Sequence, residues 1–116
     1  MSRALLIVEH DPVIAADLYI QAEDLGYDVL EPVGTVRGAL TEVAEGRVGA
    51  ALLDCHLIGE TSREVADALR ARDTRFAYVT GLPDFPTAHS GWPDAPVLRK
   101  PLGGRDLDRT LASLLG

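Results

Sequence analysis

Apolar runs alternate along this chain with segments whose apolar residues recur at helical spacing. Five runs predict β-strands, at residues 4–8, 27–33, 49–54, 76–80 and 97–99. The second run is more polar than the others, so we expect it at an edge of the sheet. Strands that alternate with helices form a parallel sheet covered on both faces. The pattern therefore predicts a doubly wound α/β fold with five parallel strands.

Residues that begin or end helices separate the predicted strands. Aspartate, serine and threonine favour a helix start, proline favours the first turn, and glycine favours a helix end. Such residues are Asp11 with Pro12, Gly26, Thr35, Gly46 and Ser62. A last helix is predicted over 105–115. Residues 81–96 hold four prolines and two glycines, so we expect the fourth helix of the fold to be short or missing.

Length, charge and cysteine content limit the partners and the compartment. The 116 residues fit one domain, spanning 1–116, with a formal charge of −7. This charge repels nucleic acid and anionic lipid, and no run of Lys or Arg opposes it, so we expect binding to neither. The first apolar run, residues 4–8, is too short for a signal core or a membrane span. A single cysteine, Cys55, forms no intrachain disulfide, which favours a reducing cytoplasm.

Polar residues follow the carboxyl ends of the predicted strands. They are Glu9, His10 and Asp11 after the first strand, Asp54 at the end of the third, Thr80 at the end of the fourth and Lys100 after the fifth. In an open parallel sheet, these ends form the binding sites. Carboxylates packed together raise one another's pKa unless a cation separates them. The set therefore indicates a divalent ion or a phosphoryl group as the partner.

These residues resemble, in kind and order, the landmarks of response-regulator receiver domains. Residues 5–12 are similar to the first strand and acidic loop of that family, and residues 51–54 with Gly59 to its phosphorylation strand and loop. Thr80-Gly81 resembles its hydroxyl-plus-small-residue pair, and Lys100-Pro101 its lysine–proline pair with a usually cis bond. The resemblance covers nearly the whole chain. It implies a CheY-like, flavodoxin-like fold with strand order 2-1-3-4-5.

Residues 75–81 further resemble a subgroup of stand-alone bacterial receivers with a Phe-x-x-x-Thr-Gly fourth strand. This finer resemblance implies a receiver that acts without an output domain of its own. The pattern itself neither requires nor excludes excision of these residues from a longer regulator.

The resemblance implies a role for each site residue. Asp54 accepts a phosphoryl group from a histidine kinase or a histidine phosphotransfer protein, while Lys100 and Thr80 bind phosphoryl oxygens. Magnesium is held by Asp54, by Glu9 through water and by the backbone carbonyl of His56. The domain then signals to a downstream protein target and is not itself an enzyme. An aspartate-nucleophile phosphatase is a more distant alternative, because such enzymes carry a second carboxylate where this chain has His56.

His10 departs from the family, which usually has a metal-ligating aspartate at that position. Magnesium prefers hard oxygen donors, so a neutral imidazole is a poor ligand for it. Three interpretations stay open: Asp11 replaces the lost ligand, the site binds metal weakly and is phosphorylated slowly or not at all, or an imidazolium supplies part of the metal's charge. We expect weak magnesium binding. A pseudo-receiver, which binds proteins without phosphorylation, is the alternative function.

Two further departures from the family concern how a signal is transmitted and how long the acyl phosphate survives. Val97 stands where many receivers have an aromatic switch residue, so we expect the loop 81–96 to transmit any signal. Leu82 and His56 flank the predicted phosphorylation pocket. An apolar Leu82 predicts slow hydrolysis of the acyl phosphate.

Overall fold

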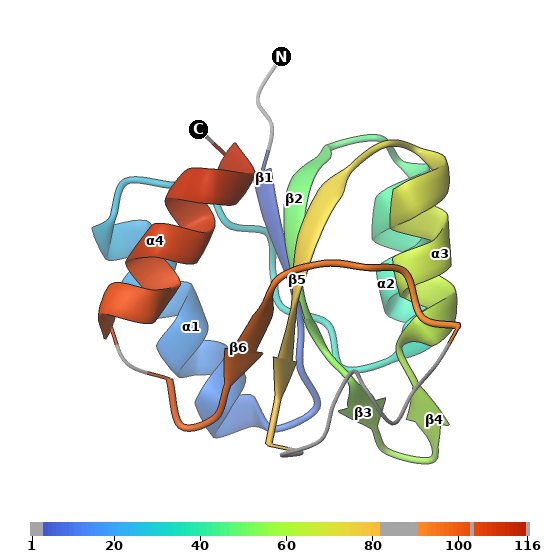
Figure 1. Ribbon diagram of the computed structural model, residues 1–116, viewed down its shortest axis with the longest axis horizontal. Coiled ribbons are helices and arrows are strands. Elements are labelled where there is room, and N and C mark those ends of the chain that lie inside the picture. The colour runs from blue at the N-terminus through green and yellow to red at the C-terminus, as the bar shows by residue number, and fades with distance from the viewer. Residues whose placement is uncertain (1–3, 82–90, 103, 116) are drawn as a thin grey trace.

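Four parallel strands form the central sheet of the computed structural model, which describes all residues except 1–3, 82–90, 103 and 116. The strands are β1 (Ala4–Val8), β2 (Val48–Asp54), β5 (Arg75–Thr80) and β6 (Val97–Arg99), in the spatial order β1-β2-β5-β6. All three strand pairs are parallel. The predicted α/β class and the crossover order are confirmed (Figure 1).

Two helices cover each face of the sheet. Helices α1 (Pro12–Asp24) and α4 (Gly104–Leu115) lie on one face, and α2 (Val36–Ala44) and α3 (Arg63–Ala71) lie on the other (Figure 1). Side chains of a strand point alternately to its two faces. Accordingly, Leu5 and Ile7 of β1 pack with the α1 and α4 core, while Leu6 and Val8 pack with the α2 and α3 core. Burial on both faces explains why β1 is apolar at every position.

The segment 27–33 lies beside β1 at the edge of the sheet but forms no regular strand. It makes two isolated parallel bridges, Leu5 with Val29 and Val8 with Val33. Backbone N–H groups of Leu30 and Val33 donate to carbonyls of β1 at 2.9 and 3.0 Å. Pro32 has no N–H group to donate, which interrupts a continuous ladder. The predicted edge position is confirmed, whereas the expected fifth strand is reduced to these bridges.

A short antiparallel hairpin follows β2, where the sequence predicted only a loop. Its strands are β3 (His56–Leu57) and β4 (Glu60–Thr61), and Gly59 in the turn has φ +73°. A positive φ is readily adopted by glycine, which explains that residue in the turn. The Glu60 carboxylate accepts a hydrogen bond of 3.0 Å from the backbone N–H of Val36, the first residue of α2. The hairpin is thereby fixed to the amino end of α2.

The predicted helix starts and ends are located correctly, with one difference in chemistry. The Asp11 carboxylate caps α1 by accepting hydrogen bonds from the backbone N–H groups of Val13 and Ile14, at 2.9 and 3.4 Å. Thr35 caps α2 in the same way, and Gly26 has φ +93° after α1. Ser62 precedes α3 but makes no side-chain capping bond. Its side chain is instead fully buried.

The described part of the proline-rich segment, residues 91–96, contains no helix. Trp92 packs edge-on against Tyr78 of β5, with ring centroids 5.7 Å apart. The Tyr78 hydroxyl donates a hydrogen bond to the Pro93 carbonyl. Trp92 therefore anchors this segment by packing against the sheet. Residues 82–90, which hold Leu82 and most of the region where the fourth helix was expected to be short or missing, lie outside the described residues.

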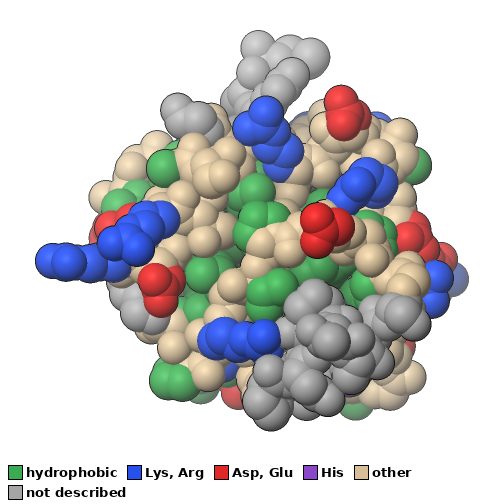
Figure 2. All heavy atoms as spheres, viewed as in Figure 1, with side chains coloured by type: hydrophobic (Ala, Val, Ile, Leu, Met, Phe, Trp, Pro, Cys, Tyr) green, Lys and Arg blue, Asp and Glu red, His purple; other side chains and the backbone are tan. Residues whose placement is uncertain are grey.

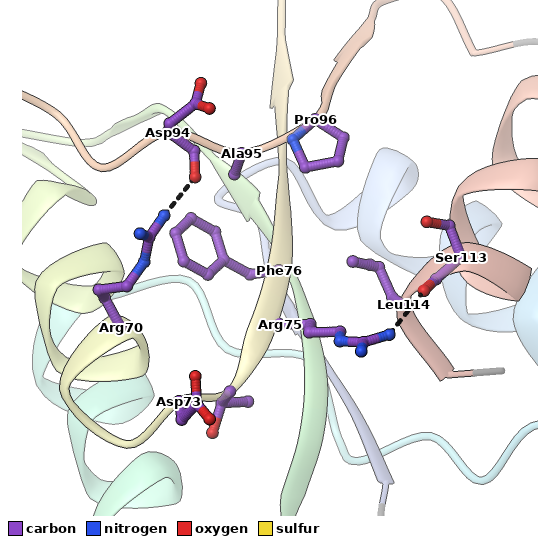
Figure 3. A pocket seen from close by; sticks show the side chains of 10 residues that line it. Arg70, Asp73, Arg75, Phe76, Asp94, Ala95, Pro96, Ser113 and Leu114 are labelled. Carbon is purple, nitrogen blue, oxygen red and sulfur yellow. Dashed lines mark hydrogen bonds between the residues drawn. The ribbon is translucent and has the colours of Figure 1, made fainter.

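A groove of about 360 Å³ lies at the amino end of β5, opposite the strand ends that carry Asp54 and Thr80. Figure 3 shows Arg70 reaching from α3 to the Asp94 carbonyl, and Arg75 reaching from β5 to the Ser113 carbonyl of α4. The two arginines thus tie the segment 91–96 and the last helix to the rest of the domain.

Charge on the face drawn in Figure 2 is mixed, with acidic and basic side chains interspersed. This distribution agrees with the sequence, in which no cluster of Lys or Arg opposes the net charge of −7. Among the described residues, no helix has the length and apolar content needed to cross a lipid bilayer.

Candidate functional site

The strand ends meet at one edge of the sheet and bring the predicted site residues together. Asp54 ends β2 and pairs with Val79 of β5, so Thr80 lies one residue further along the neighbouring strand. The backbone N–H of Lys100, just after β6, donates to the Thr80 carbonyl at 2.8 Å. Parallel pairing in register therefore places all these residues at the same level, as the sequence predicted.

Lys100 reaches the two buried carboxylates of this edge. Its Nζ lies 3.0 Å from Oε1 of Glu9 and 3.5 Å from Oδ2 of Asp54. Glu9 and Asp54 are only 3% and 4% exposed. Burying two carboxylates is costly unless cations compensate them. One ammonium supplies half of the compensating charge.

His10 contacts the same two carboxylates from the open side. Its Nδ1 lies 2.8 Å from Oδ2 of Asp54 and 3.4 Å from Oε2 of Glu9, and its side chain is 38% exposed. The ring is thus part of the site. His10 therefore faces the Asp54 carboxylate directly.

The pKa directions reflect a shortage of positive charge. Burial raises the pKa of Glu9, and its hydrogen bond with Asp54 raises it further, against the opposing effects of the Asp11 N–H and Lys100. Burial lowers the pKa of Lys100, but its hydrogen bond with Glu9 and the charge of Asp54 outweigh burial, so the pKa is raised overall. Both groups therefore hold protons more tightly than they do in water.

Asp11 lies beside this cluster rather than in it. Its carboxylate caps α1, as described above, and its backbone N–H donates to Oε2 of Glu9 at 3.1 Å. Among the described residues, the group whose ligand atoms lie within 4.8 Å of one another is Glu9, His10 and Asp54. The geometry does not support the interpretation in which Asp11 replaces the missing aspartate ligand.

His56 and Cys55 complete the surroundings of Asp54. The backbone N–H of His56 donates to Oδ1 of Asp54 at 3.3 Å, and the His56 side chain is exposed. Burial raises the pKa of the Cys55 thiol to about 12, and the nearby Asp54 charge adds to this effect. Burial contributes the most to this shift. At neutral pH, Cys55 is therefore a protonated, unreactive core side chain.

Two contributors near the site escaped sequence analysis. Glu60 holds the β3–β4 hairpin to α2, and Tyr78 holds the segment 91–96 to β5. An aromatic residue two positions before Thr80 was the available signal for Tyr78. Glu60 offered none, because its partner is a backbone group 24 residues away.

Solved structures resemble this chain over nearly its whole length. Solution structures of SdrG from Sphingomonas melonis Fr1 and of its BeF3-activated conformation, from Pseudomonas melonis Fr1, are each 41% identical, with TM-scores of 0.83 and 0.82. They cover 99% and 100% of this chain, and the chain covers 98% and 100% of theirs. The PhyR response regulator REC domain from Erythrobacter litoralis is 25% identical, with a TM-score of 0.83. The match covers 98% of this chain and 90% of that domain.

The receiver domain of the sensor histidine kinase PA1611 from Pseudomonas aeruginosa PAO1 shares the fold, with a TM-score of 0.85 at 23% identity. The match covers 100% of this chain and 99% of that domain. That structure has a magnesium ion coordinated in its active-site cleft. No protein-family model matches the chain, and no curated protein matches it. The fold, the site geometry and the 41% identity over the full length lead to one conclusion. The chain belongs to the response-regulator receiver family.

Proposed function

We propose that this chain is a two-component signalling receiver that accepts a phosphoryl group on Asp54. The observation that carries the proposal is the Lys100 ammonium, which lies within 3.5 Å of both the Asp54 and Glu9 carboxylates in a largely buried pocket. The BeF3-activated conformation of SdrG, a relative 41% identical, supports a site of this kind. The proposed donor is the phosphohistidine of a histidine kinase or a phosphotransfer protein.

In the proposed transfer, a carboxylate oxygen of Asp54 forms a bond to phosphorus as the phosphorus–nitrogen bond of the donor histidine breaks. The bond electrons return to the donor imidazole, and an acyl phosphate forms on Asp54. Lys100 neutralises charge on a phosphoryl oxygen, and the Thr80 hydroxyl donates to another. The His56 N–H, 3.3 Å from Oδ1 of Asp54, orients the carboxylate.

A divalent ion fits this chemistry, because an anionic nucleophile must approach an anionic phosphoryl group. Glu9 and Asp54 offer the hard oxygen atoms that magnesium prefers, and the His56 carbonyl is the third proposed ligand. His10 adds a nitrogen where magnesium favours oxygen. Weak magnesium binding is therefore the expectation for this chain.

Two exposed apolar side chains are positioned to meet a protein partner. Val13 is the second residue of α1, and Ile58 lies in the turn of the β3–β4 hairpin; they are 76% and 81% exposed. Both belong to segments that border the Asp54 pocket. A signalling partner that reaches Asp54 would bury them, which supports function through protein contacts.

The segment 91–96 is the proposed route for output. Val97 pairs with Tyr78 across β5 and β6 and has no long side chain to act as a switch. Tyr78 instead contacts Trp92 and the Pro93 carbonyl, only two residues from Thr80. A shift of Thr80 toward a phosphoryl oxygen would therefore displace Tyr78 and, through it, the segment 91–96. That Leu82 slows hydrolysis of the acyl phosphate remains a prediction. Membership of the subgroup of stand-alone receivers with a Phe-x-x-x-Thr-Gly fourth strand, here Phe76 to Gly81, also remains a prediction.

A pseudo-receiver is the second candidate, and one contact favours it. His10 Nδ1 lies 2.8 Å from Oδ2 of Asp54, so the ring competes for the oxygen that would accept phosphorus. In that case the domain binds proteins without phosphorylation.

Labelling with acetyl phosphate and with a panel of phosphorylated histidine kinases separates the two candidates. We expect a label on the wild type that alkali and hydroxylamine release, as for an acyl phosphate, and no label on Asp54→Asn. Intact-mass spectrometry of the protein measures the labelling. A wild type that no donor labels, while a folded His10→Asp variant is labelled, would favour the pseudo-receiver.

A further inference from the structure

The pocket offers an ion one nitrogen and two carboxylates from residues that are already close together. Ligand atoms of Glu9, His10 and Asp54 lie within 4.8 Å of one another. Two ligands at about 2.1 Å from one ion lie about 3.0 Å apart when cis in an octahedron and about 3.4 Å apart in a tetrahedron. The observed separations from Nδ1 of His10 are 2.8 Å to Asp54 and 3.4 Å to Glu9. These spacings match the edges of a first-row metal site.

The chemistry of this donor set does not fit magnesium well. Magnesium takes oxygen ligands and binds imidazole poorly, whereas manganese, cobalt and zinc ions accept imidazole together with carboxylates. For a given nitrogen- and oxygen-containing site, affinity generally rises from manganese toward copper, with zinc below copper. Replacing an aspartate by His10 therefore weakens the site for magnesium and strengthens it for these ions.

The charge balance of the pocket also favours a cation. Oε1 of Glu9 is fully buried, and the Lys100 ammonium 3.0 Å away is its partner. The Glu9 side chain is only 1% exposed. Two carboxylates face one ammonium here, so a dication would turn a net charge of −1 into +1.

The site also has an approach from solvent. A cavity of about 570 Å³ is bordered by Glu9 and His10 together with Tyr19, Glu31 and Pro32. The His10 side chain is 38% exposed, so it can reorient without disturbing the core. Its neutral ring carries the proton on either nitrogen, and a proton on Nε2 leaves the Nδ1 lone pair facing the carboxylates.

We propose that this pocket binds a first-row transition dication, of the manganese-to-zinc class, through Nδ1 of His10 and the carboxylates of Glu9 and Asp54, in preference to magnesium. The inference deepens the proposed function, since it concerns the same pocket. It rests on that function only for the biological use of the ion, because ion binding is measured without phosphotransfer.

Calorimetric titration of the whole chain with magnesium, manganese and zinc tests the preference. We expect zinc to bind the wild type at least about 100-fold more tightly than magnesium. In His10→Asp, magnesium affinity should rise about tenfold and the zinc-to-magnesium ratio should fall at least about tenfold. Asp108→Asn, which removes an exposed carboxylate of α4, is the control for non-specific charge and should leave both affinities within about twofold.

Pulsed electron paramagnetic resonance with bound manganese identifies the ligand directly. We expect a nitrogen coupling from a directly bound imidazole in the wild type and its loss in His10→Asp and His10→Asn. An unchanged ion ratio in His10→Asp, a nitrogen coupling that survives there, or no ion binding to the wild type would each overturn the proposal.

The two proposals fail separately. Nitrogen-bound manganese in a protein that no phosphodonor labels would support the ion preference and contradict the proposed phosphotransfer. Labelling of Asp54 in a wild type that prefers magnesium would do the reverse.

Discussion

The two ends of the sheet both hold charged side chains in a hollow, yet they use charge differently. At the amino end of β5, Arg70 and Arg75 each donate to a backbone carbonyl, of Asp94 and Ser113 respectively (Figure 3). A carbonyl is neutral, so each bond joins two elements and leaves the guanidinium charge to solvent. At the carboxyl end, Lys100 lies between two buried carboxylates.

The difference separates charge that holds a fold together from charge that prepares a site for a ligand. The arginines of the amino end act at exposed positions, where they pack segments against one another. At the carboxyl end, two carboxylates exceed one ammonium, and the raised pKa of Glu9, caused first by burial, reflects the imbalance. Stability alone does not favour such an arrangement. A bound cation would relieve the imbalance.

Lys100→Met should have the largest effect on stability. The substitution keeps the length of the side chain but leaves the Glu9 and Asp54 carboxylates buried without their ammonium. We expect a loss of about 2–3 kcal/mol in the free energy of unfolding at pH 7, less than for a fully buried pair because Lys100 is 21% exposed. Urea denaturation followed by circular dichroism measures it.

The loss has a defined pH dependence. The pKa of Lys100 is raised above its ordinary value of 10.5, so its stabilisation is present throughout the neutral range and disappears only as pH rises past the folded-state pKa. At low pH, Glu9, whose pKa is raised, becomes protonated and the cost of Lys100→Met should shrink. Equal losses at pH 7 and at pH 4 would show that packing, rather than charge, is what Lys100 contributes.

Glu9→Gln should have the opposite sign at neutral pH. The pKa of Glu9 is raised above 4.5 in the folded state, so the folded protein binds that proton more tightly than the unfolded chain does. The stability from this proton is complete below pH 4.5 and is lost as pH rises through the folded-state pKa. A neutral amide avoids this loss, so the variant should be more stable than the wild type at pH 7.

Thermal unfolding across pH 4 to 8 tests this sign. The advantage of Glu9→Gln over the wild type should vanish toward pH 4, where the wild-type carboxyl is itself protonated. Asp108→Asn, on the exposed surface of α4, is the matched control and should show no such pH dependence. A variant that is less stable than the wild type at pH 7 would mean that the bond from Lys100 outweighs the burial of the charge.

Features that depend on residues close together in the sequence could be predicted, whereas contacts between residues far apart in the sequence could not. Adjacent residues carry the signals for β1, for the Asp11 cap and for the strand-end carboxylates, and parallel pairing then brings Lys100 to Asp54 without further information. The reduced edge strand was less visible, because the effect of Pro32 depends on which N–H groups face β1. The Glu60 contact with α2 depends on how a hairpin folds back and has no local pattern.

His10 shows where sequence reasoning stops within the site itself. Its position identified a missing aspartate ligand, and three interpretations followed. Geometry argues against the first of them, because the Asp11 carboxylate caps α1, and it places the His10 ring 2.8 Å from Asp54. A side chain's direction out of a loop is set by packing, which residue type alone does not reveal.

Tyr78→Phe tests whether the two ends of the sheet are independent. The segment 91–96 contacts Tyr78 through Trp92 and Pro93, and it meets Arg70 at the amino end through the Asp94 carbonyl. Removing the hydroxyl leaves the Pro93 carbonyl without this donor, at a cost of about 1 kcal/mol. Fluorescence of Trp92, the single tryptophan, follows the segment.

With the phosphate mimic beryllium fluoride, we expect the Trp92 emission of the wild type to change and that of Tyr78→Phe to change at most half as much. Asp54→Asn should show no change at all. An equal response in Tyr78→Phe would mean that the signal does not pass through this contact.

Arg75→Met should have the smallest effect, which makes it the sharpest control for Lys100→Met. Both substitutions exchange a long cation for the same uncharged side chain, but at opposite ends of the sheet. Arg75 is exposed and donates to a neutral carbonyl at 3.2 Å, so we expect a loss of about 0.5–1 kcal/mol that is the same at pH 4 and pH 7. Ion affinity and labelling of Asp54 should equal those of the wild type. If Arg75→Met instead costs as much as Lys100→Met, the contrast between structural and ligand-directed charge is wrong, because the net charge of the chain rather than the local pocket would govern both losses.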